Sequence, residues 1–363
     1  MSYQMFTFAV MIEQKPTHTS LSELGEFGLI DHLTAGIAPQ HASSVKGIGD
    51  DAAVIDTGDA YSLISTDLLN EGIHFDLAYV PLKHLGYKAA VVNFSDIYAM
   101  NGTPKQITVG IAVSNRFSLE ALEEFYAGIR LACEKYQVDI VGGDTTSSRA
   151  GLFVSITVVG TVEKQDVVYR STAGEHDLIC VSGDLGSAYA GLLLLEREKA
   201  VFLADPNMQP DLEGYDYPIE RQLKPEARRD IVALFKEHGI KPTAMIDVSD
   251  GLASELLHIC KSSGVGCSVY EEKIPIDIST ITLCDSMNID PTTAAMNGGE
   301  DYELLFTISQ RDYEAIRKFQ EVSVIGHVMD AGSGMNLISR SGQAIPITAQ
   351  GWDALREEEN LDF

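Results

Sequence analysis

The stretch PLKHLGYKAAVVNFSDIYAM occupies residues 81–100 and predicts a helix that is closed by Asn101, Gly102 and Pro104. Asp96 lies inside this helical pattern, although its neighbours at positions 91, 92, 97 and 100 are apolar. A carboxylate among apolar neighbours needs a partner, which is either a cation or a set of backbone donors. The helix therefore places one acidic group where the fold must supply a partner for it.

Further acidic residues lie next to Gly, Ser or Thr in loops at or near the ends of predicted strands and helices. Such loops let the backbone approach a ligand closely, and their carboxylates point to where strand ends converge. Asp and Gly are also the commonest turn residues, so each loop taken alone is better explained as an ordinary turn. The loops are Gly49-Asp50-Asp51, Ser65-Thr66-Asp67, Ser95-Asp96, Gly142-Gly143-Asp144-Thr145-Thr146 and Asp247-Val248-Ser249-Asp250-Gly251.

Taken together, these acidic loops indicate a binding site for divalent cations. Mg²⁺ prefers oxygen ligands and is usually held by one or two carboxylates together with substrate phosphates, so scattered acids suit several Mg²⁺ ions better than one caged Ca²⁺. The chain contains no EF-hand loop, no GxxxxGK[ST] phosphate loop and no GxGxxG turn. If ATP binds, metal ions, loop amides and a few basic residues such as Arg170 must meet its charge.

Predicted strands and helices alternate in both halves of the chain. Ser118 predicts the N-cap of a helix whose apolar residues at 119, 122, 126, 129, 133 and 136 share one face, and two more helices are expected at 187–198 and 251–262. The stretch 204–216 carries two prolines and four acids, which predicts a surface excursion. Strands are expected at 61–65, 107–113, 138–141, 152–162, 178–182, 245–248, 302–308 and 322–328.

The segment 163–177 has no strong period and separates the two halves. We therefore expect a loosely ordered leader at residues 1–20, an N-terminal domain at 21–165 and a C-terminal domain at 166–363; the resemblance given below implies that the N-terminal domain binds ATP and Mg²⁺ and dimerises. Translation could start at Met1 or at Met11.

The composition excludes several classes of protein. The chain has 363 residues, 45% of them hydrophobic, which is enough for a sizeable core and argues against a disordered or fibrous protein. Its 26 Lys plus Arg against 53 Asp plus Glu give a net charge of −27 without a basic run, so we expect no binding to nucleic acid or membrane. The five cysteines form no CxxC pair, and the apolar run 6–12 is too short for a membrane span and lacks signal-peptide features. We expect a cytoplasmic protein with reduced thiols.

Seven motifs, in order along the chain from about residue 21, together resemble those of the thiamine-monophosphate kinases. Each motif is short, so the specificity lies in the ordered set. The motifs are GEFGLI at 25–30, GIGDDAA at 47–53, STDL at 65–68 with GIHF at 72–75, KAAVVNFSDI at 88–97, GGDTT at 142–146, IDVSDGL at 246–252 and GGEDYEL at 298–304.

This resemblance implies transfer of the γ-phosphoryl group of ATP, directly and in line, to the phosphate of thiamine monophosphate, which gives thiamine diphosphate and ADP. It also implies the two-domain α+β and α/β fold of the aminoimidazole-ribonucleotide-synthetase superfamily. In that fold the N-terminal domain forms a β-barrel with its copy in a homodimer, and a C-terminal α/β domain covers the site. No dedicated general base is expected, because a terminal phosphate oxygen is largely deprotonated near neutral pH and phosphoryl transfer depends on positioning and charge neutralisation.

Carried over position by position, the resemblance implies three sets of site residues. The single tryptophan, in the third set, offers a flat face to the cationic heterocycle of thiamine. The implied Mg²⁺ ligands are Asp51, Thr66, Asp67, Asp96, Asp144, Asp247 and Asp250, with Ser65 beside them in the metal set. The implied ATP contacts are Tyr126, Gly143, Arg170 and Ser249, and the implied contacts to thiamine monophosphate are His74, Glu300 and Trp352.

Other interpretations of the sequence stay open. His74, Glu300, Arg170 and Trp352 are each also compatible with ordinary structural roles. Glu175-His176-Asp177 stands where the family commonly has Gly-Asp, which affects contacts in the second domain more than the metal loops. The alternative functions are another ATP-using member of the superfamily, such as aminoimidazole ribonucleotide synthetase, and a non-catalytic acidic protein that binds divalent cations.

Overall fold

The computed structural model describes residues 21–349, and the chain divides into two compact units. The leader predicted at 1–20 and the predicted contact Trp352 lie outside the described residues. In the first unit, the described residues 21–38 contain α1 (Leu21–Thr34), which is interrupted at Gly25. Gly25 has a φ of 65°, a conformation that glycine adopts at no steric cost. The second unit, residues 39–352, contains two sheets and the remaining helices.

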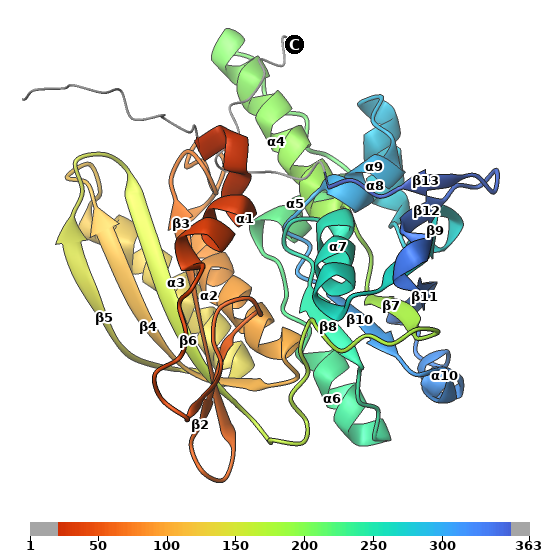
Figure 1. Cartoon of the computed structure of the whole chain (residues 1–363). Helices are drawn as coiled ribbons and strands as arrows, with labels where there is room; N and C mark the ends of the chain where they lie inside the picture. Colours follow the sequence, from red (N-terminus) through yellow and green to blue (C-terminus); the bar gives the residue numbers. More distant parts are fainter. Residues whose placement is uncertain (1–20, 350–363) are drawn as a thin grey trace, which may run out of the picture. The chain divides into compact units, whose positions relative to one another are not determined.

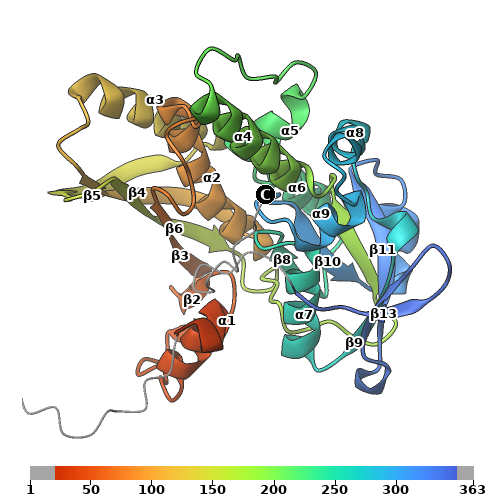
Figure 2. The same ribbon diagram turned by 90° about the horizontal axis from the view of Figure 1, so that it is seen from above.

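The first sheet of this second unit has six strands in the order β1-β2-β3-β6-β4-β5 (Figure 1). All neighbouring pairs are antiparallel except β4 and β5, which are parallel. Two helices, α2 (Leu82–Ala99) and α3 (Leu119–Tyr136), lie on one side of this sheet, as Figure 2 shows from above. Burial alternates along β6 because one face of the sheet is covered and the other is more open. The strands are β1 (Ser44–Lys46), β2 (Ala53–Asp56), β3 (Tyr61–Asn70), β4 (Thr103–Val113), β5 (Asp139–Ser147) and β6 (Leu152–Val162).

Helix α2 is buried on nearly all sides. Every residue from Leu85 to Ala99 is buried except Asp96, which is half-buried. The helix contacts β3, β4 and β6 of the first sheet, α3, and strand β8 (Ala244–Asp247) of the second sheet. A helix with apolar residues all round needs cover on every side, and α2 therefore joins the two sheets.

The second sheet has seven strands in the order β13-β12-β9-β11-β7-β10-β8. Its pairs are antiparallel except β9 with β12, and all five residues of β10 are buried, as expected for a strand covered on both faces. The other strands are β7 (Leu178–Ser182), β9 (Gly266–Tyr270), β10 (Leu304–Ile308), β11 (Val322–Met329), β12 (Met335–Ile338) and β13 (Ala344–Pro346). The helices of this half are α4 (Ser187–Ala204), α5 (Asp216–Leu223), α6 (Arg229–His238), α7 (Leu252–Ser263), α8 (Ile278–Ser286), α9 (Pro291–Asn297) and α10 (Tyr313–Ile316), with short 3₁₀ turns η1 (Glu271–Lys273), η2 (Gln310–Asp312) and η3 (Ala331–Ser333).

Most predicted elements are present, and one side chain departs from its predicted place. The predicted helices correspond to α2, α3, α4 and α7, and α4 runs six residues further than expected, to Ala204. Leu119 was expected on the buried face of α3 but is 68% exposed, whereas Phe125 is fully buried. The reason is that α2 crosses α3 near Gly128, more than two turns beyond Leu119. Residues 205–215 form the expected surface excursion, and all five cysteines are free and buried. Among the described helices, none combines the length and the apolar composition that a membrane crossing requires.

Candidate active site

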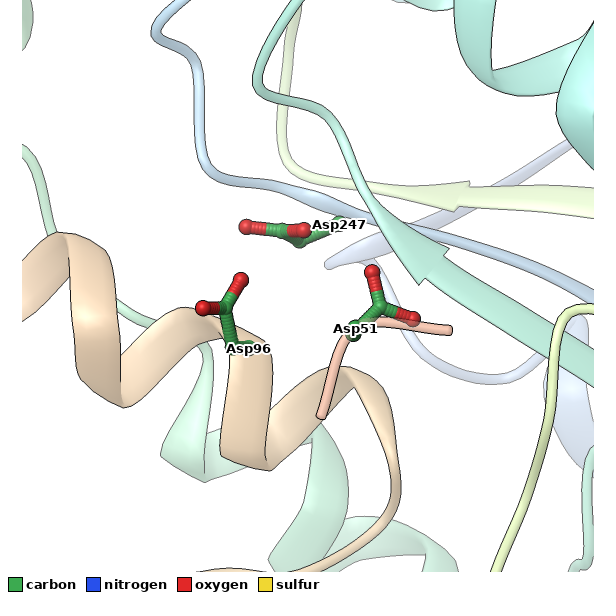
Figure 3. Close-up of side chains that lie close together, drawn as sticks. All are labelled: Asp51, Asp96 and Asp247. Carbon is green, nitrogen blue, oxygen red and sulfur yellow. The ribbon is translucent and has the colours of Figure 1, made fainter. Parts of the chain in front are cut away.

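Three aspartates from distant parts of the sequence converge between the two sheets. Asp51 precedes β2, Asp96 lies near the C-terminal end of α2, and Asp247 is the last residue of β8. One carboxylate oxygen from each lies within 4.8 Å of the others, and Figure 3 shows the three side chains turned toward one another. We call Asp51, Asp96 and Asp247 the acidic triad.

Two serine hydroxyls hold the acidic triad in place. Ser65 of β3 donates a hydrogen bond of 2.5 Å to Oδ2 of Asp96. Ser95 of α2 donates one of 2.5 Å to Oδ2 of Asp247, which joins the first half of the chain to the second. These hydrogen bonds orient two of the three carboxylates before any ligand arrives.

The positions of Asp96 and Asp247 disfavour the charged form of their carboxylates. Burial, together with the charges of Asp67, Asp247 and Asp51, raises the pKa of Asp96 well above its ordinary value. Burial and the nearby Asp51 raise the pKa of Asp247 to about 7, and burial raises the pKa of Asp67 to about 6. Buried like charges repel one another unless a cation is placed between them. The cluster therefore favours a bound cation.

The chemistry of the donors fits a hard divalent cation. All three ligands are carboxylate oxygens, which Mg²⁺ prefers, and Oδ2 of Asp51 is buried without a hydrogen-bond partner. An unpaired buried carboxylate oxygen is costly, and a metal ion would satisfy it.

Arg170 borders the triad on one side. Its Nη2 donates to Oδ1 of Asp51 over 2.6 Å, and its backbone N–H donates to Oδ1 of Asp50 over 3.2 Å. Burial would lower the pKa of Arg170, but Asp51, Glu255 and Asp50 together outweigh it and the pKa is raised, so the guanidinium stays charged. Its Nε is buried without a hydrogen-bond partner. The predicted ATP contact Arg170 thus lies beside the predicted metal ligand Asp51.

The other predicted metal residues of the first sheet and of the loop after β8 lie at different places around the triad. Asp67 donates its backbone N–H to Oδ1 of Asn93 on α2, and its charge acts on Asp96. The hydroxyl of Thr66 instead donates to the carbonyl of Ile156 on β6. Asp250, three residues after Asp247, donates its backbone N–H to Oε1 of Glu255 over 3.0 Å.

Asp144 is not part of the triad within one chain. It lies exposed on β5, the edge strand, and pairs in register with Gly110 of β4, which in turn pairs with Ser155 of β6. Ser155 is in register with Leu68 of β3. Asp144 is thus three strands from β3, roughly 14 Å at the usual spacing between strands. Of the predicted ATP contacts, Gly143 lies on β5 beside Asp144, and Tyr126 lies on α3.

The predicted contacts to thiamine monophosphate form a second group. His74 accepts a hydrogen bond at Nδ1 from the backbone N–H of Asn70 over 3.0 Å, so its neutral ring carries the proton on Nε2. Burial lowers the pKa of His74, and the charge of Glu300 acts in the opposite direction, which places the two residues near each other. Glu300 also donates its backbone N–H to the carbonyl of Ser249, a predicted ATP contact, over 2.7 Å.

Several residues of this region were absent from the predicted site. Asp50 precedes Asp51 directly, and burial together with the charge of Asp51 raises its pKa to about 6. Ser95 and Lys88 lie within the KAAVVNFSDI motif. Each is a polar residue in an otherwise apolar helix, and this feature of the sequence could have identified them. The buried Glu255 and Gln222 carried no signal in the sequence, since their roles depend on packing.

Comparisons with known proteins match both halves of the chain. Residues 49–162 match the N-terminal domain of AIR synthase related proteins, and residues 175–335 match the C-terminal domain. The thiamine-monophosphate kinase of Aquifex aeolicus (strain VF5) is 35% identical over 87% of this chain and 94% of its own length, and that of Bacillus subtilis (strain 168) is 33% identical over 91% and 99%. A solved structure of AaThiL complexed with AMPPCP and TMP is 32% identical, with a TM-score of 0.80, and covers 93% of this chain and 99% of its own.

The fold and the site define an AIR synthase-related protein with two α+β domains. Within that class, the chain belongs to the thiamine-monophosphate kinase family.

Proposed function

We propose that the protein phosphorylates thiamine monophosphate with ATP, giving thiamine diphosphate and ADP. The observation that carries this proposal is the acidic triad, which gathers three carboxylates from both halves of the chain beside Arg170. The relatives named above and the complex of AaThiL with AMPPCP and TMP support the same pair of substrates.

The proposed reaction is a direct in-line transfer. An oxygen of the thiamine monophosphate phosphate forms a bond to the γ-phosphorus of ATP, while the bond from that phosphorus to the bridging oxygen breaks and ADP leaves with its electron pair. The attacking oxygen is largely deprotonated near neutral pH, because the second pKa of a phosphate ester is about 6. The protein therefore needs to align two anions rather than to supply a base.

Two mutually repelling phosphates have to meet inside a protein of net charge −27. We propose that Asp51, Asp96 and Asp247 hold Mg²⁺, and that Ser65, Thr66, Asp67, Asp144 and Asp250 belong to the sites of several such ions. Bound Mg²⁺ supplies the positive charge that lets the phosphates approach. Arg170 adds a fixed positive charge at the edge of the triad.

The substrate contacts follow from the same arrangement. Arg170, Ser249, Gly143 and Tyr126 would contact ATP. His74, through its Nε2 proton, and Glu300 would contact thiamine monophosphate, together with Trp352. The hydrogen bond from Glu300 to Ser249 supports two adjoining substrate sites.

We further propose a homodimer in which the two N-terminal sheets form a β-barrel. Strand β5 is an edge strand whose residues are all exposed, including Ile140 and Val141, and Leu68 on β3 is 60% exposed. Unpaired edges and exposed apolar groups mark surfaces that another chain covers. A second copy would also bring its own Asp144 and Gly143 toward the triad of the first.

Two less central features belong to this proposal. The N-terminal domain would end near residue 165, which the separate family matches at 49–162 and 175–335 support. We also propose a cytoplasmic location, in keeping with five free, buried cysteines.

The proposed function is tested by incubating the purified protein with Mg²⁺-ATP and one of three acceptors: thiamine monophosphate, thiamine, or an aminoimidazole precursor. We expect thiamine diphosphate from the first acceptor and no product from the others. Turnover of the aminoimidazole precursor alone would favour the aminoimidazole ribonucleotide synthetase alternative.

A thermal shift experiment separates the enzyme from a non-catalytic protein that binds divalent cations. Mg²⁺ with a non-hydrolysable ATP analogue should stabilise the protein more than either ligand alone, because binding to the folded state raises its stability. A full shift with Mg²⁺ alone would support the non-catalytic alternative.

A further inference from the structure

Lys88 is a buried lysine close to the predicted contacts for thiamine monophosphate. Only 3% of its surface is exposed, and its Nζ lies 2.7 Å from Oε1 of Glu300. The same Nζ donates to the backbone carbonyl of Gln222 over 3.2 Å. Lys88 lies on α2, Gln222 on α5 and Glu300 in the loop before β10, so one ammonium group joins three elements from both halves of the chain.

An ion pair between a buried lysine and a partly exposed carboxylate is poorly explained by stability alone. Burying an ammonium costs about as much as its attraction to the carboxylate returns, and apolar side chains of similar volume often stabilise a protein as well or better. Lys88 is also the one charged side chain between Leu85 and Phe94 on a helix that is otherwise suited to burial. The ion pair therefore calls for a functional explanation.

The contacts of Glu300 hold its carboxylate in one orientation. Oε1 is bound by Lys88, and Oε2 accepts a hydrogen bond of 2.7 Å from Nε2 of Gln222. The backbone of Glu300 has a φ of 67°, and its N–H is bound to Ser249. A carboxylate has about four acceptor positions, so the residues that the structure describes leave two of them for a ligand.

The spacing along α2 relates this carboxylate to the acidic triad. Lys88 and Asp96 are eight residues apart on one helix, which corresponds to about 12 Å along its axis. Because α2 is buried and carries both Lys88, which contacts Glu300, and Asp96, it relates the position of Glu300 to that of the triad. An elongated substrate with a phosphate at one end and a polar ring at the other suits this separation.

We infer that Lys88, assisted by Gln222, is a positioning residue that orients the Glu300 carboxylate toward the ring end of the phosphorylated substrate. This inference rests on the proposed function, in which Glu300 contacts thiamine monophosphate. It adds to that function a reason for the specificity of the site, since a carboxylate with a fixed direction selects a hydrogen-bond donor at one place on the ring.

The test measures calorimetric binding of thiamine monophosphate and steady-state kinetics for Lys88→Met, Glu300→Gln and the double variant. Lys88→Met should raise both Kd and KM for thiamine monophosphate about tenfold, the equivalent of one charge-assisted hydrogen bond. The KM for ATP should stay unchanged, because ATP is not expected to contact Glu300. In the double variant the Lys88 substitution should add nothing, since its effect passes through Glu300.

Two further variants guard against a trivial outcome. Lys164→Met removes a surface lysine that pairs with Asp56 at 2.6 Å, and it should leave both constants unchanged. Gln222→Leu keeps Lys88 but removes the second hydrogen bond to Glu300, so it should also raise KM for thiamine monophosphate if Lys88→Met does not fold.

The possible failures are distinguishable. If the parent protein does not bind thiamine monophosphate, the proposed function itself is wrong. If the parent binds it but folded Lys88→Met and Gln222→Leu bind it equally well, or if the effects of Lys88→Met and Glu300→Gln are additive, this inference is overturned and the ion pair is purely structural.

Discussion

The Asp96 side chain affects stability and ligand binding in opposite directions. It lies on a helix that is otherwise buried, and its carboxylate is surrounded by Asp51, Asp67 and Asp247. Without a cation these charges repel, and with one they become ligands. The residue is therefore unfavourable for stability and favourable for binding, a combination common at functional sites.

Replacing Asp96 should separate these two effects. Asp96→Asn keeps an acceptor for the hydroxyl of Ser65 but removes one negative charge. We expect turnover to fall by about a thousandfold or more, since a metal ligand is lost, while the melting temperature of the metal-free protein at pH 8 rises. Asp56→Asn, at a surface pair with Lys164, is the control and should keep its activity. Activity within a few-fold of the parent would contradict the role of Asp96 as a ligand.

The raised pKa values also predict how the stability of the metal-free protein depends on pH. The folded-state pKa is about 7 for Asp247 and about 6 for Asp67, against an ordinary value of 3.8. The folded state therefore holds protons that the unfolded state has released, and stability falls as the pH rises from about 4 to 7. The contribution is about 1–4 kcal/mol for each group.

Denaturant unfolding in EDTA at pH 5 and pH 8 measures this loss. Asp247→Asn should reduce the difference between the two pH values, because one of the groups no longer titrates. An equal difference in the parent and the variant would show that Asp247 does not titrate in this range.

At the scale of elements, α2 and α3 touch through two glycines. A Cβ at Gly86 would lie 1.9 Å from the carbonyl oxygen of Phe125, and one at Gly128 would lie 1.9 Å from that of Lys83. No side chain fits at these distances, so the helices cross with their backbones in contact. This close crossing fixes α2 against α3.

Gly128→Ala should therefore destabilise the protein by about 1–3 kcal/mol or more, because the helices must move apart. Gly142→Ala is a suitable comparison, since its Cβ would lie 3.7 Å from Cγ2 of Thr108, an ordinary contact. The two free energies of unfolding are compared in urea. Equal free energies of unfolding for the two variants would show that α2 and α3 can move apart without loss of stability.

At the scale of the whole molecule, the proposed homodimer makes a prediction about two inactive variants. Asp96→Asn and Asp144→Asn should each abolish turnover. If Asp144 acts on the triad of the partner, a mixed dimer of the two variants contains one site with both aspartates intact. Equal amounts of the variants, unfolded and refolded together, should then recover about a quarter of the parent activity, as random pairing in a symmetric dimer requires.

Activity of the mixed sample, compared with that of each variant refolded alone, is the measurement. A tag on one variant shows that mixed dimers have formed. If mixed dimers are present but activity does not recover, Asp144 acts in the site of its own chain or outside the site altogether.

Much of the fold followed from local patterns. The helix at 81–100 and the strand at 178–182 were predicted almost residue by residue, because each is a mainly apolar run bounded by turn residues, and both signals are local. The helices α5, α6, α8 and α9 were not predicted. They have seven to ten residues each, and helices this short are stabilised mainly by what they pack against.

The sequence by itself determined which residues are candidates for the chemistry, because Asp, Ser and Gly in ordered motifs are visible without a structure. Only the tertiary structure decided which of them meet. The hydrogen bond from Ser95 to Asp247 and the ion pair from Lys88 to Glu300 each span more than 150 residues, so they exist only once α2 has packed against the second half of the chain. The same packing buries the acidic triad, and burial of like charges is what turns ordinary aspartates into a site that needs a cation.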